Sequence, residues 1–356
     1  MTATPRDALS AERVDYSALL KALAALLVAN SHLEHFYPRA WMAGDGLLGN
    51  SLFFLLAGYG LVRSDLVRQR TFRAWIWRRL VRLYPTVLLV VAVLALGVGG
   101  GWRVWSWRDY LHELVWPTDF TFVQLIVPFY VVFFALLRTR SRSVFTWGMM
   151  LAGALYLAVY IPDAMRTASN DTLHLSSRPY FAHAFAYFQM MLLGAWFGAT
   201  REERVASWTR WLAFAVASVA YLVLKLAMVQ GHFAREYVLL HALTFAWCFL
   251  AFECFRDRAI IEGLGAAPRL WRATTFVGGL TLEIYVVHSF FAEYAWLYSI
   301  RFPLNVVVFW AMTLPSAWLT WRVVSVVQAR LRGDREGAFP AARSAPDAAL
   351  GASAAQ

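Results

Sequence analysis

The chain has little charge and almost no cysteine. Asp, Glu, Lys and Arg make up 15% of its 356 residues, whereas 60% are hydrophobic. In soluble domains about a quarter of the residues are charged and about half are apolar, so this composition excludes a soluble fold. Cys248 and Cys254 are the two cysteines, and they lack the CxxC spacing of a metal site. We conclude that the chain is an integral membrane protein without a disulfide framework.

Lysine is also scarce, because 31 of the 33 basic residues are arginine. A net charge of +11 would suggest nucleic acid as the partner of a soluble protein, but here the arginines are spread between apolar runs. With a cytoplasmic N-terminus, 24 arginines fall in inner segments and 7 in outer loops. By the positive-inside rule this bias places both termini in the cytoplasm, and we expect no nucleic-acid partner.

Continuous apolar runs, each long enough to cross a bilayer, predict an all-α, polytopic bundle of ten transmembrane helices. The runs do not alternate at period two, which excludes a β-barrel. We expect a cytoplasmic segment over 1–15, a membrane domain over 16–328 and a disordered cytoplasmic tail over 329–356, where Ala, Gly, Ser and Pro dominate. The predicted spans are 16–32, 47–63, 83–101, 121–137, 144–161, 180–199, 208–228, 237–255, 275–298 and 304–327.

His32 ends the first run, and ionisable side chains within membranes tend to mark functional pathways. Lys21 lies eleven residues earlier, so on a helix the two share one stripe and are about 16 Å apart. They indicate a polar track through the bundle; the alternative is a snorkelling lysine and an interfacial histidine. His35 follows closely, but a third ligand and the HExxH pattern are missing, so we expect no metal.

Arg79 and Arg82 precede the third run at a spacing that puts both on one helical face. Guanidinium groups bind phosphate oxygens in a bidentate manner, so the pair is suited to hold a polyphosphate at the inner surface. The alternative is that both arginines are topology anchors that contact lipid head groups.

The ninth run contains Glu283, Tyr285 and His288. On a helix, Tyr285 and His288 share a face, whereas Glu283 points away from Tyr285. For His288 we consider a direct role in chemistry and a structural hydrogen bond between helices to be equally supported. In the second run, Gly58 and Gly60 would permit close helix packing.

These residues, in this order, resemble the motifs of the membrane-bound acyltransferase 3 family over residues 16 to 328. The family's opening of Asp, a basic residue, an apolar run and His is similar to Asp15, Lys21, 23–28 and His32. Its "FFxxSGY" is similar to residues 53–59, with Ala57 in place of the serine, so this position is not expected to be a nucleophile. Its "RxxR" before proline and its late "YLxH" are similar to residues 79–85 and 285–288, and the "WF" of its fourth span is similar to 122–124 without the tryptophan.

The resemblance implies a cytoplasmic acyl-CoA donor, commonly acetyl-CoA, as co-substrate with no permanently bound cofactor. It also implies an acceptor presented on the outer side; a saccharide or glycolipid at the inner membrane of the cell is expected. Some relatives carry a fused SGNH domain, and from residues 44–46 and the short tail we expect none here. As donor-binding candidates we name Arg79, Arg82 and Lys21, and as substrate-binding candidates Asn50, Tyr59 and Tyr285.

The predicted chemistry is general-base catalysis by His32, which would remove the proton of an acceptor hydroxyl that attacks the thioester. Asp45 is expected to orient the imidazole, and Glu283 and His288 complete the catalytic candidates. A covalent acyl-histidine route stays open beside direct transfer. The rival function is a proton-coupled saccharide transporter that uses the same histidines and Glu283 as a relay; a non-catalytic scaffold would leave the polar residues of the spans unexplained.

Overall fold

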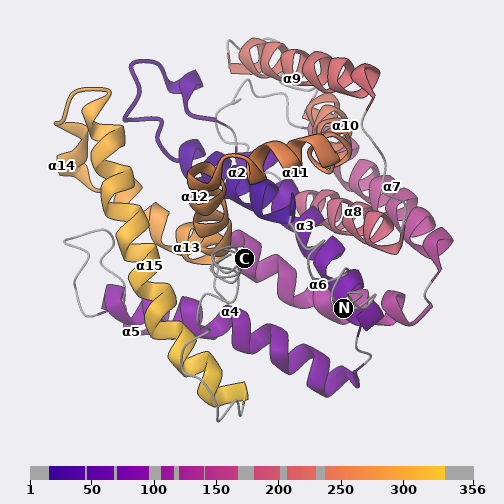
Figure 1. The fold of residues 1–356 in the computed structure, drawn as a ribbon, viewed down its shortest axis with the longest axis horizontal. Helices are drawn as coiled ribbons and strands as arrows, with labels where there is room; N and C mark the ends of the chain where they lie inside the picture. The colour runs from indigo at the N-terminus through magenta and orange to yellow at the C-terminus, as the bar shows by residue number, and fades with distance from the viewer. Residues whose placement is uncertain are drawn as a thin grey trace, which may run out of the picture.

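The computed structural model describes residues 16–44, 46–67, 70–95, 106–115, 120–139, 141–166, 180–200, 207–229 and 237–332. Within these ranges the regular structure is helical, as the sequence predicts. The helices form one bundle in which α9 lies at the periphery and α15 runs along another side (Figure 1). Their bounds are α2 Tyr16–Ser31, η1 Ala40–Met42, α3 Gly46–Val67, α4 Phe72–Ala95, α5 Trp107–Val115, α6 Thr121–Thr139, α7 Arg142–Arg166, α8 Tyr180–Ala199, α9 Trp208–Val229, α10 Tyr237–Phe255, α11 Arg258–Gly265, α12 Pro268–Gly279, α13 Thr281–Ala292, α14 Ala295–Tyr298 and α15 Leu304–Arg332.

Six segments are long and apolar enough to cross a membrane. They are the segment Ala40–Leu66, which includes most of α3, and α6, α7, α9, α10 and α15; a bent pair, α12 with α13, would make a seventh. The described helices thus form a multi-pass membrane protein. The total of ten spans and the cytoplasmic termini stay predictions; α2, for example, has 16 residues, about 24 Å of helix.

The centre of the bundle is the contact between α3 and α8, whose backbones touch. A Cβ atom on Gly58 would stand 1.8 Å from the carbonyl oxygen of Met191, and one on Gly194 would stand 1.8 Å from that of Leu55. Small residues permit such close packing in membrane helices. The prediction of close packing is therefore confirmed for Gly58 and wrong for Gly60, beside which a Cβ would meet nothing within 4 Å.

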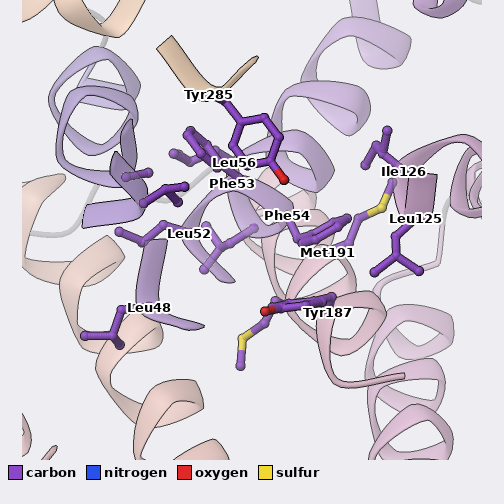
Figure 2. Packing of buried hydrophobic residues seen from close by; sticks show 14 of the residues in the cluster. Leu48, Leu52, Phe53, Phe54, Leu56, Leu125, Ile126, Tyr187, Met191 and Tyr285 are labelled. Atoms are coloured by element: carbon purple, nitrogen blue, oxygen red, sulfur yellow. The ribbon is translucent and has the colours of Figure 1, made fainter. Parts of the chain in front are cut away.

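Aromatic side chains fill the space around this contact. Phe54 stacks on Tyr187 with ring centroids 4.9 Å apart, and Met191 lies next to them, as Figure 2 shows. Phe53 and Tyr285 meet edge to face on the adjoining side, with centroids 5.9 Å apart. The core thus extends from α3 to α13, and it positions the last motif of the sequence against the second one.

The run over 275–298 does not form one helix, so this prediction is wrong. The chain bends by 75° between α12 and α13, with Leu280 at the joint. Close packing on α2 accompanies the bend, since a Cβ on Gly278 would stand 2.4 Å from the carbonyl oxygen of Ala18. Thr281 then donates its hydroxyl hydrogen to the Gly278 oxygen over 2.6 Å, which satisfies a carbonyl at the break. Broken helices occur at membrane depth where protein surrounds them.

Seven of the other predicted runs lie within helices, namely 47–63, 121–137, 144–161, 180–199, 208–228, 237–255 and 304–327. Helix α2 ends at Ser31, one residue before the predicted end at 32, and the part of the run over 83–101 that follows Ala95 lies outside the described residues. α8 and α10 have the predicted bounds, whereas α4 begins at Phe72, eleven residues before the predicted start at 83, and so includes Arg79 and Arg82. Short helix α5 was not predicted. At the other end of the domain, α15 continues to Arg332, beyond the predicted boundary at 328.

Candidate functional site

The fold brings His32 and His288 together although 256 residues separate them in the sequence. Their ring centroids are 4.9 Å apart and the ring planes are inclined by 61°, an edge-to-face contact. His32 lies directly after the last residue of α2 and is exposed, even though protein surrounds it on most sides. His288 is buried in α13, with 2% of its surface accessible. His32 is therefore an exposed residue in contact with a buried one.

The orientation of His288 follows from one hydrogen bond. Its Nδ1 lies 3.0 Å from the carbonyl oxygen of Ile284, one turn earlier in α13. A carbonyl oxygen only accepts, so Nδ1 carries a proton and donates it. The second nitrogen, Nε2, is buried and has no hydrogen-bond partner among the described residues.

Tyr285 packs beside the pair formed by His32 and His288. Its ring centroid lies 6.0 Å from that of His288, and its hydroxyl oxygen accepts the backbone N–H of Phe122 over 3.0 Å. That N–H belongs to the first turn of α6, which has no acceptor within the helix. Tyr285 therefore caps α6 and packs against Phe53; its polar atom is engaged with the protein rather than exposed.

Glu283 lies in the first turn of α13, and its carboxyl group faces Thr86 and Arg82 of α4. The side chain is 5% accessible and that of Thr86 is fully buried. Glu283 precedes His288 by five residues, about 7.5 Å of helix. The structure therefore places Glu283 beside Arg82, about one and a half helical turns from His288.

Arg79 and Arg82 have different surroundings despite their shared helical face. Arg79 is half-buried, donates from Nη2 to the Ser64 hydroxyl over 2.8 Å, and lies over the ring of Trp75 at 5.2 Å. Its Nε is buried without a hydrogen-bond acceptor in the described part of the chain. Arg82 is exposed, and its own carbonyl accepts a hydrogen bond from Gln328. One guanidinium is thus held in place by protein and the other is accessible.

The remaining candidates are spread along the bundle. Asn50 lies in the first turns of α3, near the end of α2, and its Oδ1 is buried without a hydrogen-bond partner among the described residues. Tyr59 lies nine residues further along α3, about 14 Å away by helical rise, and packs on Phe252 of α10. Lys21 is half-buried in α2. Asp15 and Asp45 lie outside the described residues.

A set of polar residues that the sequence analysis missed fixes the segment 33–44 after His32. Asn305, which is 3% accessible, donates to the carbonyl oxygen of Phe36 over 2.7 Å. Tyr37 donates its hydroxyl to Asn30 over 2.5 Å, and Lys225 donates to the Ala43 carbonyl over 3.4 Å. The signal was present, since Lys225 and Asn305 are polar residues within apolar runs.

A second polar group, also missed, lies where α7, α8 and α10 meet. The Tyr156 hydroxyl and the His241 Nδ1 are 3.1 Å apart, and the ring of His183 lies 5.7 Å from that of His241. Among the described residues, no three His, Cys, Asp or Glu side chains gather in a way that could hold a metal ion. His35 packs against Tyr298, with ring centroids 5.4 Å apart.

The polar residues therefore form two groups, one on α4 that Glu283 of α13 faces and one that His288 of α13 forms with His32. The first group comprises Arg79, Arg82, Thr86 and Glu283. By helical rise, Arg79 to Thr86 is about 10 Å and Glu283 to His288 about 7.5 Å. An arrangement with anion-binding side chains in one group and imidazoles in the other suits a long, phosphate-bearing donor whose reactive group is remote from its phosphates.

Comparison with known proteins identifies the family of the chain. The family model for an acyltransferase domain, acyltransferase 3, matches residues 14–322, which include each of the polar positions from Lys21 to Asn305. No curated protein matches the chain. No solved structure matches it either. Because the match extends over most of the 356 residues and its motifs meet in the fold, the chain belongs to the acyltransferase 3 family of membrane acyltransferases.

Proposed function

We propose that the protein is a membrane O-acyltransferase that moves an acyl group, foremost acetyl, from cytoplasmic acyl-CoA to a hydroxyl group of a saccharide. The acceptor is a surface or exported polysaccharide, or its lipid-linked precursor, at the inner membrane of the cell. The observation that carries the proposal is the exposed His32 ring in contact with His288. Family membership supports the acyl transfer, and the rest is inferred from the chemistry of the residues.

The donor would bind through its phosphates to Arg79 and Arg82. Arg79 has a donor nitrogen, Nε, that no described residue uses, and the accessible guanidinium of Arg82 lies one turn further along α4. Hydrogen bonds between guanidinium groups and phosphate oxygens are charge-assisted and bidentate. Lys21 of α2 would contribute a third positive charge.

The pantetheine arm would then extend along α4 and α13 toward His32, from the first group of polar residues to the second. His32 in its neutral form removes the proton of the acceptor hydroxyl, and the oxygen attacks the thioester carbon. The C–S bond breaks, and the proton passes from His32 to the sulfur to give the free thiol. Asp45 and Asn50 would orient the imidazole and the acceptor at this end of α3.

The experiment compares His32→Ala with His35→Ala in membranes that contain the endogenous acceptor and radiolabelled acetyl-CoA. His35 is an exposed histidine three residues away, so it controls for the loss of an imidazole from this segment. We expect His32→Ala to lower the transfer of label to glycan by about 100-fold or more, a typical contribution of a general base, and His35→Ala to leave it unchanged. Transfer that survives in His32→Ala would remove His32 from the mechanism.

The same experiment separates transfer from transport. A proton-coupled saccharide transporter would leave glycan unlabelled in every variant, including the wild type. An acyl-histidine intermediate would show as label bound to the protein when the acceptor is removed, and double-displacement kinetics would accompany it.

A further inference from the structure

His288 is held in a single tautomer by its own helix. Nδ1 donates to the Ile284 carbonyl over 3.0 Å, so the lone pair of the neutral ring belongs to Nε2. A proton on Nε2 would be a buried donor without an acceptor, because no described residue offers one to this atom. A buried donor without an acceptor is destabilising, which favours the form in which Nε2 accepts.

The group placed to meet that lone pair is the ring of His32. The two rings are in edge-to-face contact at a centroid distance of 4.9 Å, so no third group fits between them. His32 lies after the end of α2 and is an exposed residue, so its ring is not part of the helix core. His288 is 2% accessible and fixed, so rotation of the His32 ring decides whether a nitrogen of each ring faces the other.

We propose that His288 is a positioning residue whose Nε2 accepts the N–H of His32, so that the other nitrogen of His32 presents its lone pair to the acceptor hydroxyl. This inference rests on the proposed function. It adds a relay in which the Ile284 carbonyl holds His288 and His288 in turn holds His32. A base oriented by a third group is the general arrangement of activated nucleophile sites, where that group fixes tautomer and direction.

The protons balance along this relay. The hydroxyl proton moves to the free nitrogen of His32 as the C–O bond forms, and from there to the sulfur as the C–S bond breaks. While His32 carries two protons, its hydrogen bond to Nε2 of His288 becomes charge-assisted and roughly twice as strong as a neutral one. His288 keeps its Nδ1 proton throughout, because the Ile284 carbonyl accepts it in every step.

The test uses three substitutions of His288 in the full-length protein, in membranes with the endogenous acceptor and radiolabelled acetyl-CoA. His288→Phe keeps the ring shape and removes both nitrogens. His288→Gln can place a side-chain oxygen at the position of Nε2, and His288→Asn reaches only the position of Nδ1. The maximal rate of label transfer, the KM for acetyl-CoA and the thermal unfolding midpoint are measured for each variant.

We expect His288→Phe to lower the maximal rate about 100-fold with an unchanged KM, because His288 acts on the base and not on the donor. The maximal rate of His288→Gln should be at least tenfold higher than that of His288→Phe and that of His288→Asn. A rate for His288→Phe within threefold of wild type, or no advantage of Gln over Asn, would overturn the proposal. If His288→Phe does not accumulate, the comparison of Gln with Asn decides alone. Absence of transfer in the wild type would instead refute the proposed function, and this inference with it.

Discussion

Two helix contacts in the same bundle, α3 with α8 and α2 with α13, differ in the kind of side chain that fills them. Between α3 and α8, glycines bring the backbones together and apolar rings fill the surroundings, so that Gly58 and Gly194 leave no space for a methyl group. Between α2 and α13, the contact contains two imidazoles, one of them exposed, and the adjoining helix is broken at Leu280. The first contact joins two helices through backbone and apolar side chains, and the second joins them through a pair of polar rings.

The largest effect is expected from the apolar contact. Gly194→Val adds a branched side chain whose Cβ would overlap the Leu55 carbonyl, and backbone atoms cannot turn aside as a flexible side chain would. Overpacking costs about 1–3 kcal/mol, and more where backbone must move. We expect loss of the folded protein from membranes, measured by accumulation in detergent extracts. Gly60→Val is the control, and we expect it to accumulate like the wild type. A loss of folded protein equal to that of Gly194→Val would show that added side-chain bulk alone is harmful.

The next effect concerns the donor. Arg79→Ala removes a guanidinium that Ser64 and Trp75 hold in place, and hydrogen bonds to charged groups contribute about 1.5–3 kcal/mol, or roughly 10- to 100-fold in affinity. The KM for acetyl-CoA should rise by that factor with little change in the maximal rate. Arg78→Ala, at the exposed neighbour, is the matched control. Equal KM values in the two variants would reassign Arg79 to topology.

A smaller effect is expected at the segment that follows His32. Asn305→Leu leaves the Phe36 carbonyl without its donor, a loss of about 1–3 kcal/mol. The free energy of unfolding should fall by this amount and the maximal transfer rate several-fold, since His32 begins the segment that Asn305 fixes. Ser299→Ala, at an exposed hydroxyl on the preceding turn, should change neither quantity. If Asn305→Leu is destabilised but its maximal transfer rate is unchanged, the segment 33–44 does not contribute to catalysis.

The sequence predicted most of the helices because the length of an apolar run indicates the length of its helix. Helices α8 and α10, for example, have the expected bounds. It did not predict the bend at Leu280, since the apolar run continues through it and the close contact beside it joins Gly278 to Ala18, far apart in the chain. Two adjacent glycines, Gly278 and Gly279, were the signal that could have indicated a break.

In the site, spacing alone predicted that Arg79 and Arg82 share one helical face. It did not predict their unequal burial, because Arg79 is held by contacts with Ser64 and Trp75. The meeting of His32 with His288 depends on the packing of α2 against α13, which no local pattern contains. Asn305 went unrecognised because its partner is a backbone carbonyl 269 residues away.

The most direct test of the account is the transfer of label from radiolabelled acetyl-CoA to glycan in membranes that contain either the wild-type protein or His32→Ala at equal amounts. The account predicts labelled glycan with the wild type and a signal at least about 100-fold weaker with the variant. Glycan that is unlabelled with the wild type, or labelled equally by both proteins, would contradict it.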